Sequence, residues 1–317
     1  MSVKISVAEY ALDPGDIAVA ARRVGAEITL GPLSSSEDVR RSTEGADALL
    51  VTLQPLRKEH IAALSDSVKV IARAGVGLDT IDVTAAAERG IRVVYQPTYA
   101  INEVADQAAA MLLASWRRLQ LADNYVRTDG WAKASEMGAV RALQDATLGV
   151  LGAGRIGRAL IKRMAPFVSS VLAWDAEPND NISGVRWADS AIEVLESSDL
   201  ITLHLPLMED THHLIDAVAI ARMQDGVILV NVSRGGLVDE NALAQALISG
   251  KIAAAGLDVF EHEPLPQQSA LREAPNLLLS PHMAWYSVDS SRRLTSWSIE
   301  DAVSFIESGE VKNGQLA

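Results

Sequence analysis

Short apolar runs rich in β-branched residues alternate with amphipathic stretches along most of the chain. In the first third the apolar runs are residues 3–7, 48–53, 68–72 and 91–95, and stretches such as 14–24 and 58–64 between them have helical spacing. A second series of apolar runs comprises 148–151, 171–174, 200–205, 227–232, 253–257 and 277–279, again with helical spacing between its members. Strands that alternate with helices are typical of parallel sheets, so the pattern predicts an α/β protein with two doubly wound sheets.

Two longer helices are predicted outside this alternation. Residues 101–124 are rich in alanine and leucine, and we expect one long helix that bridges the two domains. Residues 290–308 carry a single apolar stripe and end at Gly309, a common helix stop, so a terminal helix is expected there.

Composition narrows the class of protein. A length of 317 residues gives room for two domains, and the absence of cysteine excludes disulfides, thiolate metal sites and a cysteine nucleophile. With 41 acidic and 28 basic residues, the net charge of −13 disfavours nucleic acid or anionic membrane as a partner. The longest apolar stretch, near residues 108–114, is too short to span a bilayer. We therefore expect a soluble, cytoplasmic protein.

The strongest local motif is a glycine loop between a strand and a helix. Gly152, Gly154 and Gly157 form a G-x-G-x-x-G pattern directly after the run 148–151. In such a loop the first glycine permits the tight turn, the second lets the backbone approach a pyrophosphate, and the third allows close packing of helix on strand. The backbone amides around Arg155 and Ile156 would then lie at a helix N-terminus, which favours anions. The motif predicts a dinucleotide site.

An acidic residue after the next strand supports this interpretation. Asp175 follows the run 171–174, 18 residues after Gly157, where a carboxylate accepts hydrogen bonds from the adenosine ribose hydroxyls. A carboxylate there also repels a 2′-phosphate, so NAD is expected rather than NADP. The alternative is that Asp175 only starts a turn before Pro178.

Three further polar residues follow later strands, at the edge where open α/β sheets bind ligands. They are Arg234 after the run 227–232, Glu263 after 253–257, and His282 after 277–279. A histidine paired with a carboxylate is held in one tautomer, keeps its proton to higher pH and can donate it to a carbonyl oxygen, while arginine suits a planar carboxylate. With hydride from a nicotinamide, these groups suit interconversion of a 2-oxo acid and a 2-hydroxy acid.

With these residues the chain resembles the D-isomer-specific 2-hydroxyacid dehydrogenase family, and within it the branch of phosphoglycerate dehydrogenases and C-terminal binding proteins. The motifs that carry the resemblance are the glycine loop and residues 72–82, 203–207, 231–239, 256–264 and 280–282.

The resemblance implies a Rossmann NAD-binding domain, 99–286, inserted in a flavodoxin-like substrate domain, 1–98 and 287–317. It implies that His282 is the acid/base, that Glu263 supports it and that Arg234 binds the substrate carboxylate. It also implies a nicotinamide contact at Asp258 and a second carboxylate clamp at the backbone of Val76 and Gly77. The other residues expected to line the cofactor are His204, Pro206, Val232, Ser233 and Ala284.

Several interpretations remain open at this level. Trp285 packs at a domain interface or shapes the substrate pocket. The apolar content of 101–124 and 129–141, together with the resemblance, predicts a homodimer. The alternative to an enzyme is a binding protein that senses NADH and presents a surface to a partner.

No metal site is expected. His212 and His213 are adjacent, which is poor geometry for holding one ion from a helix, and no carboxylate cluster completes a site around them.

Overall fold

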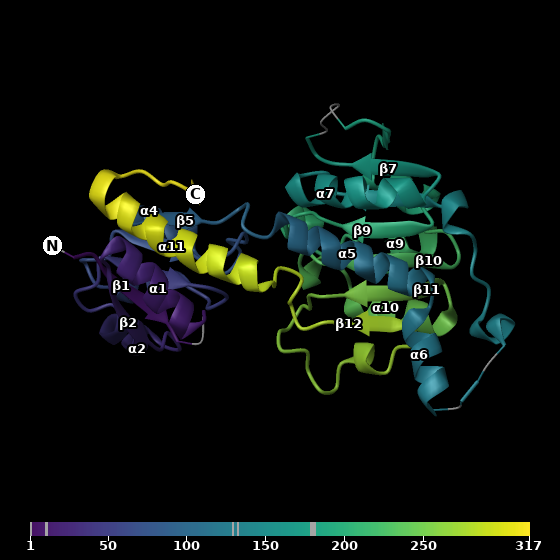
Figure 1. Cartoon of the computed structure of the whole chain (residues 1–317), viewed down its shortest axis with the longest axis horizontal. Helices are drawn as coiled ribbons and strands as arrows, with labels where there is room; N and C mark the ends of the chain where they lie inside the picture. Colours follow the sequence, from purple (N-terminus) through teal and green to yellow (C-terminus); the bar gives the residue numbers. More distant parts are fainter. Residues whose placement is uncertain (1, 10–11, 129, 132, 178–181) are drawn as a thin grey trace. The chain divides into compact units, whose positions relative to one another are not determined.

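The computed structural model describes residues 2–9, 12–128, 130–131, 133–177 and 182–317. The chain divides into two compact units (Figure 1). Unit 1 comprises Met1–Ala100 and Tyr286–Ala317, and unit 2 comprises Ile101–Trp285.

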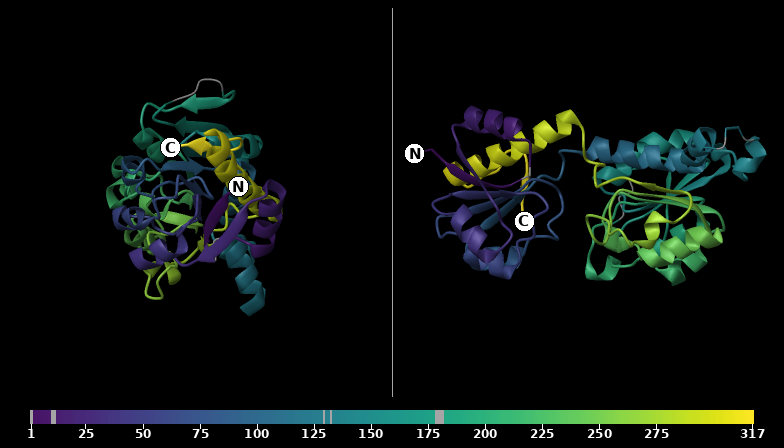
Figure 2. Two further views of the ribbon diagram at one scale, coloured as in Figure 1. Left: turned by 90° about the vertical axis from the view of Figure 1, so that its left-hand side faces the viewer. Right: turned by 90° about the horizontal axis from the view of Figure 1, so that it is seen from below.

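Unit 1 is built on a six-stranded sheet in the order β2-β1-β3-β4-β5-β13. The first five strands are parallel, and their order 2-1-3-4-5 is that of flavodoxin-like folds. The strands are β1 (Lys4–Ala8), β2 (Glu27–Gly31), β3 (Ala48–Val51), β4 (Val70–Arg73), β5 (Arg92–Tyr95) and the antiparallel β13 (Gln315–Leu316). Helices α1 (Pro14–Val24) and α11 (Val288–Ser308) cover one face of this sheet, and α2 (Ser36–Ser42), α3 (Lys58–Ala63) and α4 (Val83–Glu88) cover the other (Figure 2).

Unit 2 is built on a seven-stranded parallel sheet in the order β8-β7-β6-β9-β10-β11-β12. Counted from β6, this is the Rossmann order 3-2-1-4-5-6 with one further strand, and the order reverses between β6 and β9. The strands are β6 (Thr147–Leu151), β7 (Ser170–Trp174), β8 (Val185–Trp187), β9 (Leu200–Leu203), β10 (Val227–Asn231), β11 (Ile252–Leu257) and β12 (Leu277–Leu279). The two doubly wound parallel sheets confirm the predicted fold class.

Helices pack on both faces of the second sheet. One face is covered by α5 (Ile101–Trp116) and α7 (Arg155–Met164), and the other by α8 (Ala191–Ser197), α9 (Ala217–Arg222) and α10 (Glu240–Ser249). Helix α6 (Leu119–Thr128) extends from this unit (Figure 1). Short 3₁₀ turns lie at Ala134–Met137, Leu143–Asp145, Ala165–Phe167, Glu209–Thr211, Gly235–Leu237 and Ala270–Arg272.

The apolar runs of the sequence are explained by this two-sided burial. In β10, Ile228 and Val230 enter the core beneath α5 and α7, while Val227 and Leu229 enter the core beneath the other helices. A strand buried on both faces has no polar alternation, so it appears in the sequence as a continuous apolar run.

The expected long helix at 101–124 is wrong. Helix α5 ends at Trp116 and α6 begins at Leu119, because Arg118 between them adopts a left-handed backbone with φ of 53°. The helix also does not bridge the two units: α5 belongs wholly to unit 2, where its buried face packs against α7 and the sheet.

Two smaller differences concern strands. The run 48–53 forms a strand only to Val51, and the sequence analysis did not identify β2, β8 or the antiparallel β13. Within the described part of the chain, no helix has the length and apolar character needed to cross a membrane.

Candidate functional site

The glycine loop lies at the point where the strand order reverses in unit 2. Gly152 follows β6 with φ of 93°, and a Cβ there would lie 2.6 Å from the carbonyl carbon and oxygen of His204, just after β9. A Cβ on Gly157 would lie 2.1 Å from the carbonyl oxygen of Gly152. Only glycine fits at these two positions without displacing backbone atoms.

Gly154, the second glycine of the loop, faces open space and marks the surface on which a ligand can bind. A Cβ on Gly154 would meet nothing within 4 Å, so the space above this residue is open. Gly154 is also the N-cap of α7 and provides no side-chain cap for the helix. Uncapped amides at a helix N-terminus beside open space suit a pyrophosphate, so the residues present fit a dinucleotide. Arg155 and Ile156, which were expected to contribute, form the first turn of α7.

Asp175 lies directly after β7 and contacts the glycine loop. Its Oδ2 accepts a hydrogen bond from the backbone amide of Ala153 at 2.7 Å, and its Oδ1 accepts one from Glu177 at 3.1 Å. The carboxylate is therefore held beside the loop and also caps its own turn. Pro178, which figured in the alternative interpretation, lies outside the described residues.

His204 lies where β9 ends, against Gly152. Its Nε2 is 3.1 Å from the Thr202 hydroxyl oxygen, and its Nδ1 is buried without a hydrogen-bond partner among the residues that the structure describes. Burial lowers the pKa of His204 to about 4, so the ring is neutral near pH 7.

The other expected cofactor residues of this region follow β9 and β10. The Ser233 hydroxyl donates to the carbonyl of Leu203 at 2.9 Å and so ties the two strand ends together. Val232 is buried, whereas Pro206 is exposed.

His282 and Glu263 are brought together across 19 residues of sequence. His282 Nδ1 lies 2.6 Å from Glu263 Oε2, and the backbone amide of Phe260 donates to the other carboxylate oxygen at 3.0 Å. Burial favours a raised pKa for Glu263, but the hydrogen bond and charge of His282, the Phe260 amide and the charge of Arg234 outweigh it and lower the pKa. Because Arg234 acts on Glu263, the three expected catalytic residues share one electrostatic environment.

Arg234 follows β10 in a loop that its neighbours hold in place. The Asn231 side-chain amide donates to the Arg234 carbonyl at 2.7 Å, and the guanidinium donates to the carbonyl of Ser233 at 2.8 Å. A Cβ at Gly235, the next residue, would lie 1.9 Å from the carbonyl carbon of Phe260. The absence of a side chain therefore lets the Arg234 loop approach the loop that carries Glu263.

Asp258 is buried and braces the segment that bears His282. Its carboxylate accepts hydrogen bonds from the Ser280 hydroxyl, from the Met283 amide at 3.0 Å and from the Ala284 amide at 2.7 Å. The backbone carbonyl of Asp258 accepts a hydrogen bond from the backbone amide of His282 at 2.8 Å. His282 itself has a φ of 51°, a left-handed conformation that such bracing stabilises.

Two positioning residues were missed by the sequence analysis. Ser280 links Asp258 to the side-chain amide of Gln107 in α5, which donates to the Ser280 hydroxyl at 3.2 Å. Ser280 precedes His282 by two positions and lies in the motif 280–282, so the sequence could have indicated its role. The sequence holds no signal for Gln107.

The remaining expected substrate residues are divided between the units. Trp285, at the end of unit 2, donates from Nε1 to the carbonyl of His282 at 3.0 Å. Val76 and Gly77 belong to unit 1, in the loop that follows β4. The buried Arg73 supports that loop, because its Nε donates to the carbonyl of Gly77 at 2.9 Å.

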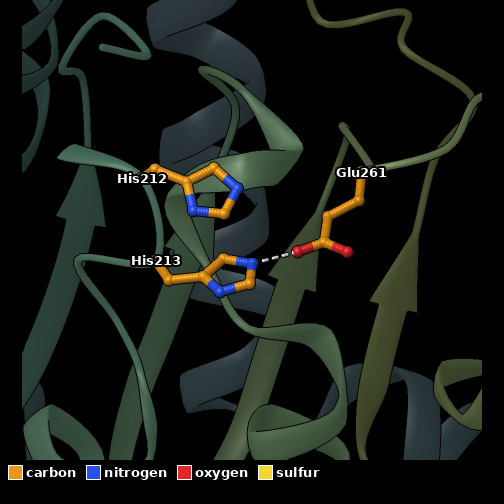
Figure 3. Close-up of side chains that lie close together, drawn as sticks. All are labelled: His212, His213 and Glu261. Atoms are coloured by element: carbon orange, nitrogen blue, oxygen red, sulfur yellow. Dashed lines mark hydrogen bonds and ion pairs between the residues drawn. The ribbon is translucent and has the colours of Figure 1, made fainter. Parts of the chain in front are cut away.

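One premise of the argument against a metal site does not hold. His212 and His213 lie in a turn rather than a helix, their rings are stacked 4.0 Å apart, and Glu261 contacts His213 from another loop (Figure 3).

The chain is similar to known proteins. Residues 109–284 match the NAD-binding domain of the D-isomer specific 2-hydroxyacid dehydrogenases. The chain is 38% identical over 92% of its length to D-3-phosphoglycerate dehydrogenase of Mycobacterium tuberculosis, of which it spans 55%. It is 36% identical to the hydroxypyruvate reductase of Thermotoga maritima, over 84% of this chain and 87% of that one.

Solved structures show the same fold. The D-lactate dehydrogenase of Aquifex aeolicus, complexed with NAD and lactic acid, superimposes with a TM-score of 0.86 at 27% identity, covering 96% of this chain and 95% of that one. The TT0316 protein of Thermus thermophilus superimposes with a TM-score of 0.87 at 32% identity, covering 98% and 99%. The chain belongs to the D-isomer specific 2-hydroxyacid dehydrogenase family and carries its NAD-binding domain.

Proposed function

We propose that this chain is an NAD-dependent oxidoreductase that interconverts a D-2-hydroxy acid and the corresponding 2-oxo acid, with His282 as the acid/base. The observation that carries the proposal is the 2.6 Å contact between His282 Nδ1 and Glu263 Oε2, under the charge of Arg234. This pair lies on loops that follow the carboxyl ends of β11 and β12, in the same unit as the glycine loop. Family membership supports the reaction class, since relatives are named hydroxypyruvate reductase, glyoxylate reductase and glycerate dehydrogenase.

The pair determines which imidazole nitrogen meets the substrate. An ionised carboxylate can only accept hydrogen bonds, so Nδ1 of His282 carries the hydrogen that points at Glu263. Nε2 is then the atom that transfers a proton to or from the substrate oxygen. When the imidazole is charged, Glu263 stabilises it, and Glu263 therefore acts as a positioning residue rather than as an acid or base itself.

Arg234 supplies a planar, permanently charged group for the substrate carboxylate. NAD(H), when bound, supplies or takes the hydride. We assign a further substrate contact to Trp285. The cofactor is assigned to the open face of Gly154 and the first turn of α7, flanked by Asp175, His204, Pro206, Val232 and Ser233, with Asp258, His282 and Ala284 towards the nicotinamide end.

NAD is the proposed cofactor rather than NADP. The Asp175 carboxylate is held beside the glycine loop by the Ala153 amide, where its charge repels a 2′-phosphate. Equal or tighter binding of NADPH than NADH, measured by fluorescence titration, would contradict this assignment.

A homodimer is proposed on the apolar surface of α6 and the segment after it. Helix α6 buries none of its residues within unit 2, Leu119 and Val126 on it are more than half exposed, and Trp131 is 86% exposed. Residues 129 and 132 of this segment lie outside the described residues. Light scattering should report twice the monomer mass for the parent and a lower mass for the double variant Val126→Ser, Trp131→Ser. A monomeric parent at micromolar concentration refutes the dimer.

The function is tested by NADH oxidation with a panel of 2-oxo acids that includes glyoxylate, pyruvate and hydroxypyruvate. We expect turnover of at least one acid, formation of the D-isomer where the product is chiral, and a loss of about 100-fold or more in His282→Ala. The matched control is His262→Ala, an exposed histidine beside Glu263. If His282→Ala binds NADH and turns over the preferred acid at the parental rate, the mechanism is wrong and an NADH-sensing binding protein is favoured.

A further inference from the structure

The turn that contains His212 and His213 presents two imidazole rings on one side of the chain. His212 has φ −62° and ψ 127°, His213 has φ 51°, and the Leu214 amide donates to the Thr211 carbonyl at 3.1 Å. These values are those of a type II turn with the histidines at its two central positions. The left-handed position of such a turn favours glycine, so the presence of histidine there costs conformational energy.

The turn is anchored on the loop that follows β10. The His213 amide donates to the carbonyl of Gly236 at 2.7 Å, and the His212 amide donates to Met208 at 2.9 Å. A Cβ built on Gly236 would lie 3.5 Å from His212 Cδ2, so the imidazole lies close over this glycine. The backbone of the turn is thus held by these contacts, while the imidazole rings remain at the surface.

A carboxylate from a third segment completes the group. Glu261 lies in the loop after β11, 48 residues from His213, and its carboxylate contacts His213 Nε2 (Figure 3). The Glu261 amide donates to Glu240 Oε1 at 2.8 Å, which holds this loop against α10. The ligand atoms of His212, His213 and Glu261 all lie within 4.8 Å of one another.

We propose that His212, His213 and Glu261 form a binding site for Zn²⁺, outside the catalytic pair. Two imidazole nitrogens and one carboxylate oxygen are ligands that Zn²⁺ prefers, with water in the fourth position. Tetrahedral coordination with bonds of about 2.0–2.2 Å places ligand atoms roughly 3.3–3.6 Å apart. In the structure the two rings are stacked 4.0 Å apart at an interplanar angle of 29°, so both must turn about their side-chain torsions to direct a nitrogen at one ion. His212 is exposed and the side chains of His213 and Glu261 are 35% and 30% exposed, which leaves room for these rotations.

The ion would join the turn at 212–213 to the loop that also carries Glu263, and the turn itself rests on the loop that carries Arg234. Gly236 lies two residues after Arg234, and Phe260, next to Glu261, donates its amide to Glu263. Because the two sites are close, the pair of His282 and Glu263 is the main alternative site for Zn²⁺. The experiment must therefore distinguish binding at this pair from binding at the group of His212, His213 and Glu261.

Isothermal titration of the tag-free full chain with ZnCl₂ tests the proposal. We expect one ion per chain with a Kd on the order of micromolar. Affinity should fall at least about tenfold in His212→Ala and in Glu261→Gln. It should remain within about twofold of the parent in His262→Gln, an exposed histidine beside Glu261, and in His282→Gln, which removes the catalytic imidazole.

Three results overturn the proposal: no saturable binding by the parent, parental affinity in both cluster variants, or loss of binding in His282→Gln with retention in His212→Ala. Far-UV circular dichroism and thermal melts of each variant establish that it folds, and all the exchanged side chains lie at the surface or are only partly buried. The outcome is independent of dehydrogenase activity, since the titration contains no substrate or NADH.

Discussion

Replacing Glu263 by Gln isolates the charge of this residue from its hydrogen bond. The amide oxygen of Gln can still accept from His282 Nδ1, which lies 2.6 Å from the carboxylate in the parent, so the tautomer is retained. The variant loses the negative charge that favours the imidazolium form of His282. Oxidation of the 2-hydroxy acid passes a proton to the imidazole, so the variant, which stabilises the imidazolium less, should have a lower kcat than the parent.

The size of the effect on kcat follows from the geometry. A hydrogen bond to a charged group contributes about 1.5–3 kcal/mol. The side chains of His282 and Glu263 are 23% and 29% exposed, so solvent screening favours the lower end of that range. A contribution of about 1.5 kcal/mol corresponds to about a tenfold change in rate.

The assay is kcat for oxidation of the D-2-hydroxy acid by NAD, measured in parent, Glu263→Gln and the control Glu273→Gln, which changes an exposed glutamate elsewhere in the same unit. The kcat should fall by about tenfold in Glu263→Gln alone. A parental kcat in Glu263→Gln refutes the assignment of Glu263 as the partner of His282.

The same pair has a signature in stability. The pKa of Glu263 is lowered in the folded chain from its ordinary value of 4.5, so ionisation of this carboxylate stabilises the fold above that pH. This contribution disappears as pH falls through the lowered pKa. Urea titrations should therefore show a difference between parent and Glu263→Gln that shrinks on acidification below about pH 4.5.

Three further outcomes are expected. Gly152→Ala should lower the free energy of unfolding by about 3 kcal/mol and weaken NADH binding, because its Cβ meets the His204 backbone; Gly226→Ala, at a similar φ of 80° but in open space, should cost only about 1 kcal/mol. Asp175→Asn, which keeps an acceptor for the Ala153 amide, should narrow the preference for NADH over NADPH by about tenfold in fluorescence titrations, and an unchanged ratio would argue against a role for the charge. The pKa of His204 is lowered to about 4 in the folded chain, so between pH ~6.5 and ~4 the unfolded chain binds a proton at this residue and the folded chain does not. Over this range the free energy of unfolding should fall by up to about 3 kcal/mol more in the parent than in His204→Gln.

The sequence was most informative where one physical constraint acts on consecutive residues. Strands of unit 2 such as β9 and β10 are buried on both faces, so their residues are apolar throughout and the strands are visible as runs. The edge strands β2 and β8 are partly exposed and follow no such rule. The glycine loop was predictable because two of its glycines lie too close to other backbone atoms to carry a side chain.

Contacts between distant segments were beyond the sequence. The end of α5 depends on the left-handed backbone of Arg118, and no glycine or proline marks that position. Glu261 meets His213 only because the loop after β11 folds back onto the turn at 212–213, so a rule based on local spacing misses the group. The pairing of Glu263 with His282 was expected because both residues follow the carboxyl ends of parallel strands. The hydrogen bonds by which Asp258, Ser280 and Gln107 hold the His282 segment could not be predicted from the sequence.

Unit 1 is assembled from two segments that unit 2 separates in the sequence, and this has a consequence for biosynthesis. Its first 100 residues leave the ribosome long before α11, whose Leu294, Ile299 and Val303 complete the core against the sheet. The intervening 185 residues of unit 2, from 101 to 285, take roughly 10–40 s to synthesise at about 5–20 residues per second. Unit 2 is continuous in sequence and can fold during that interval, while the part of the nascent sheet that α11 later covers still lacks this helix.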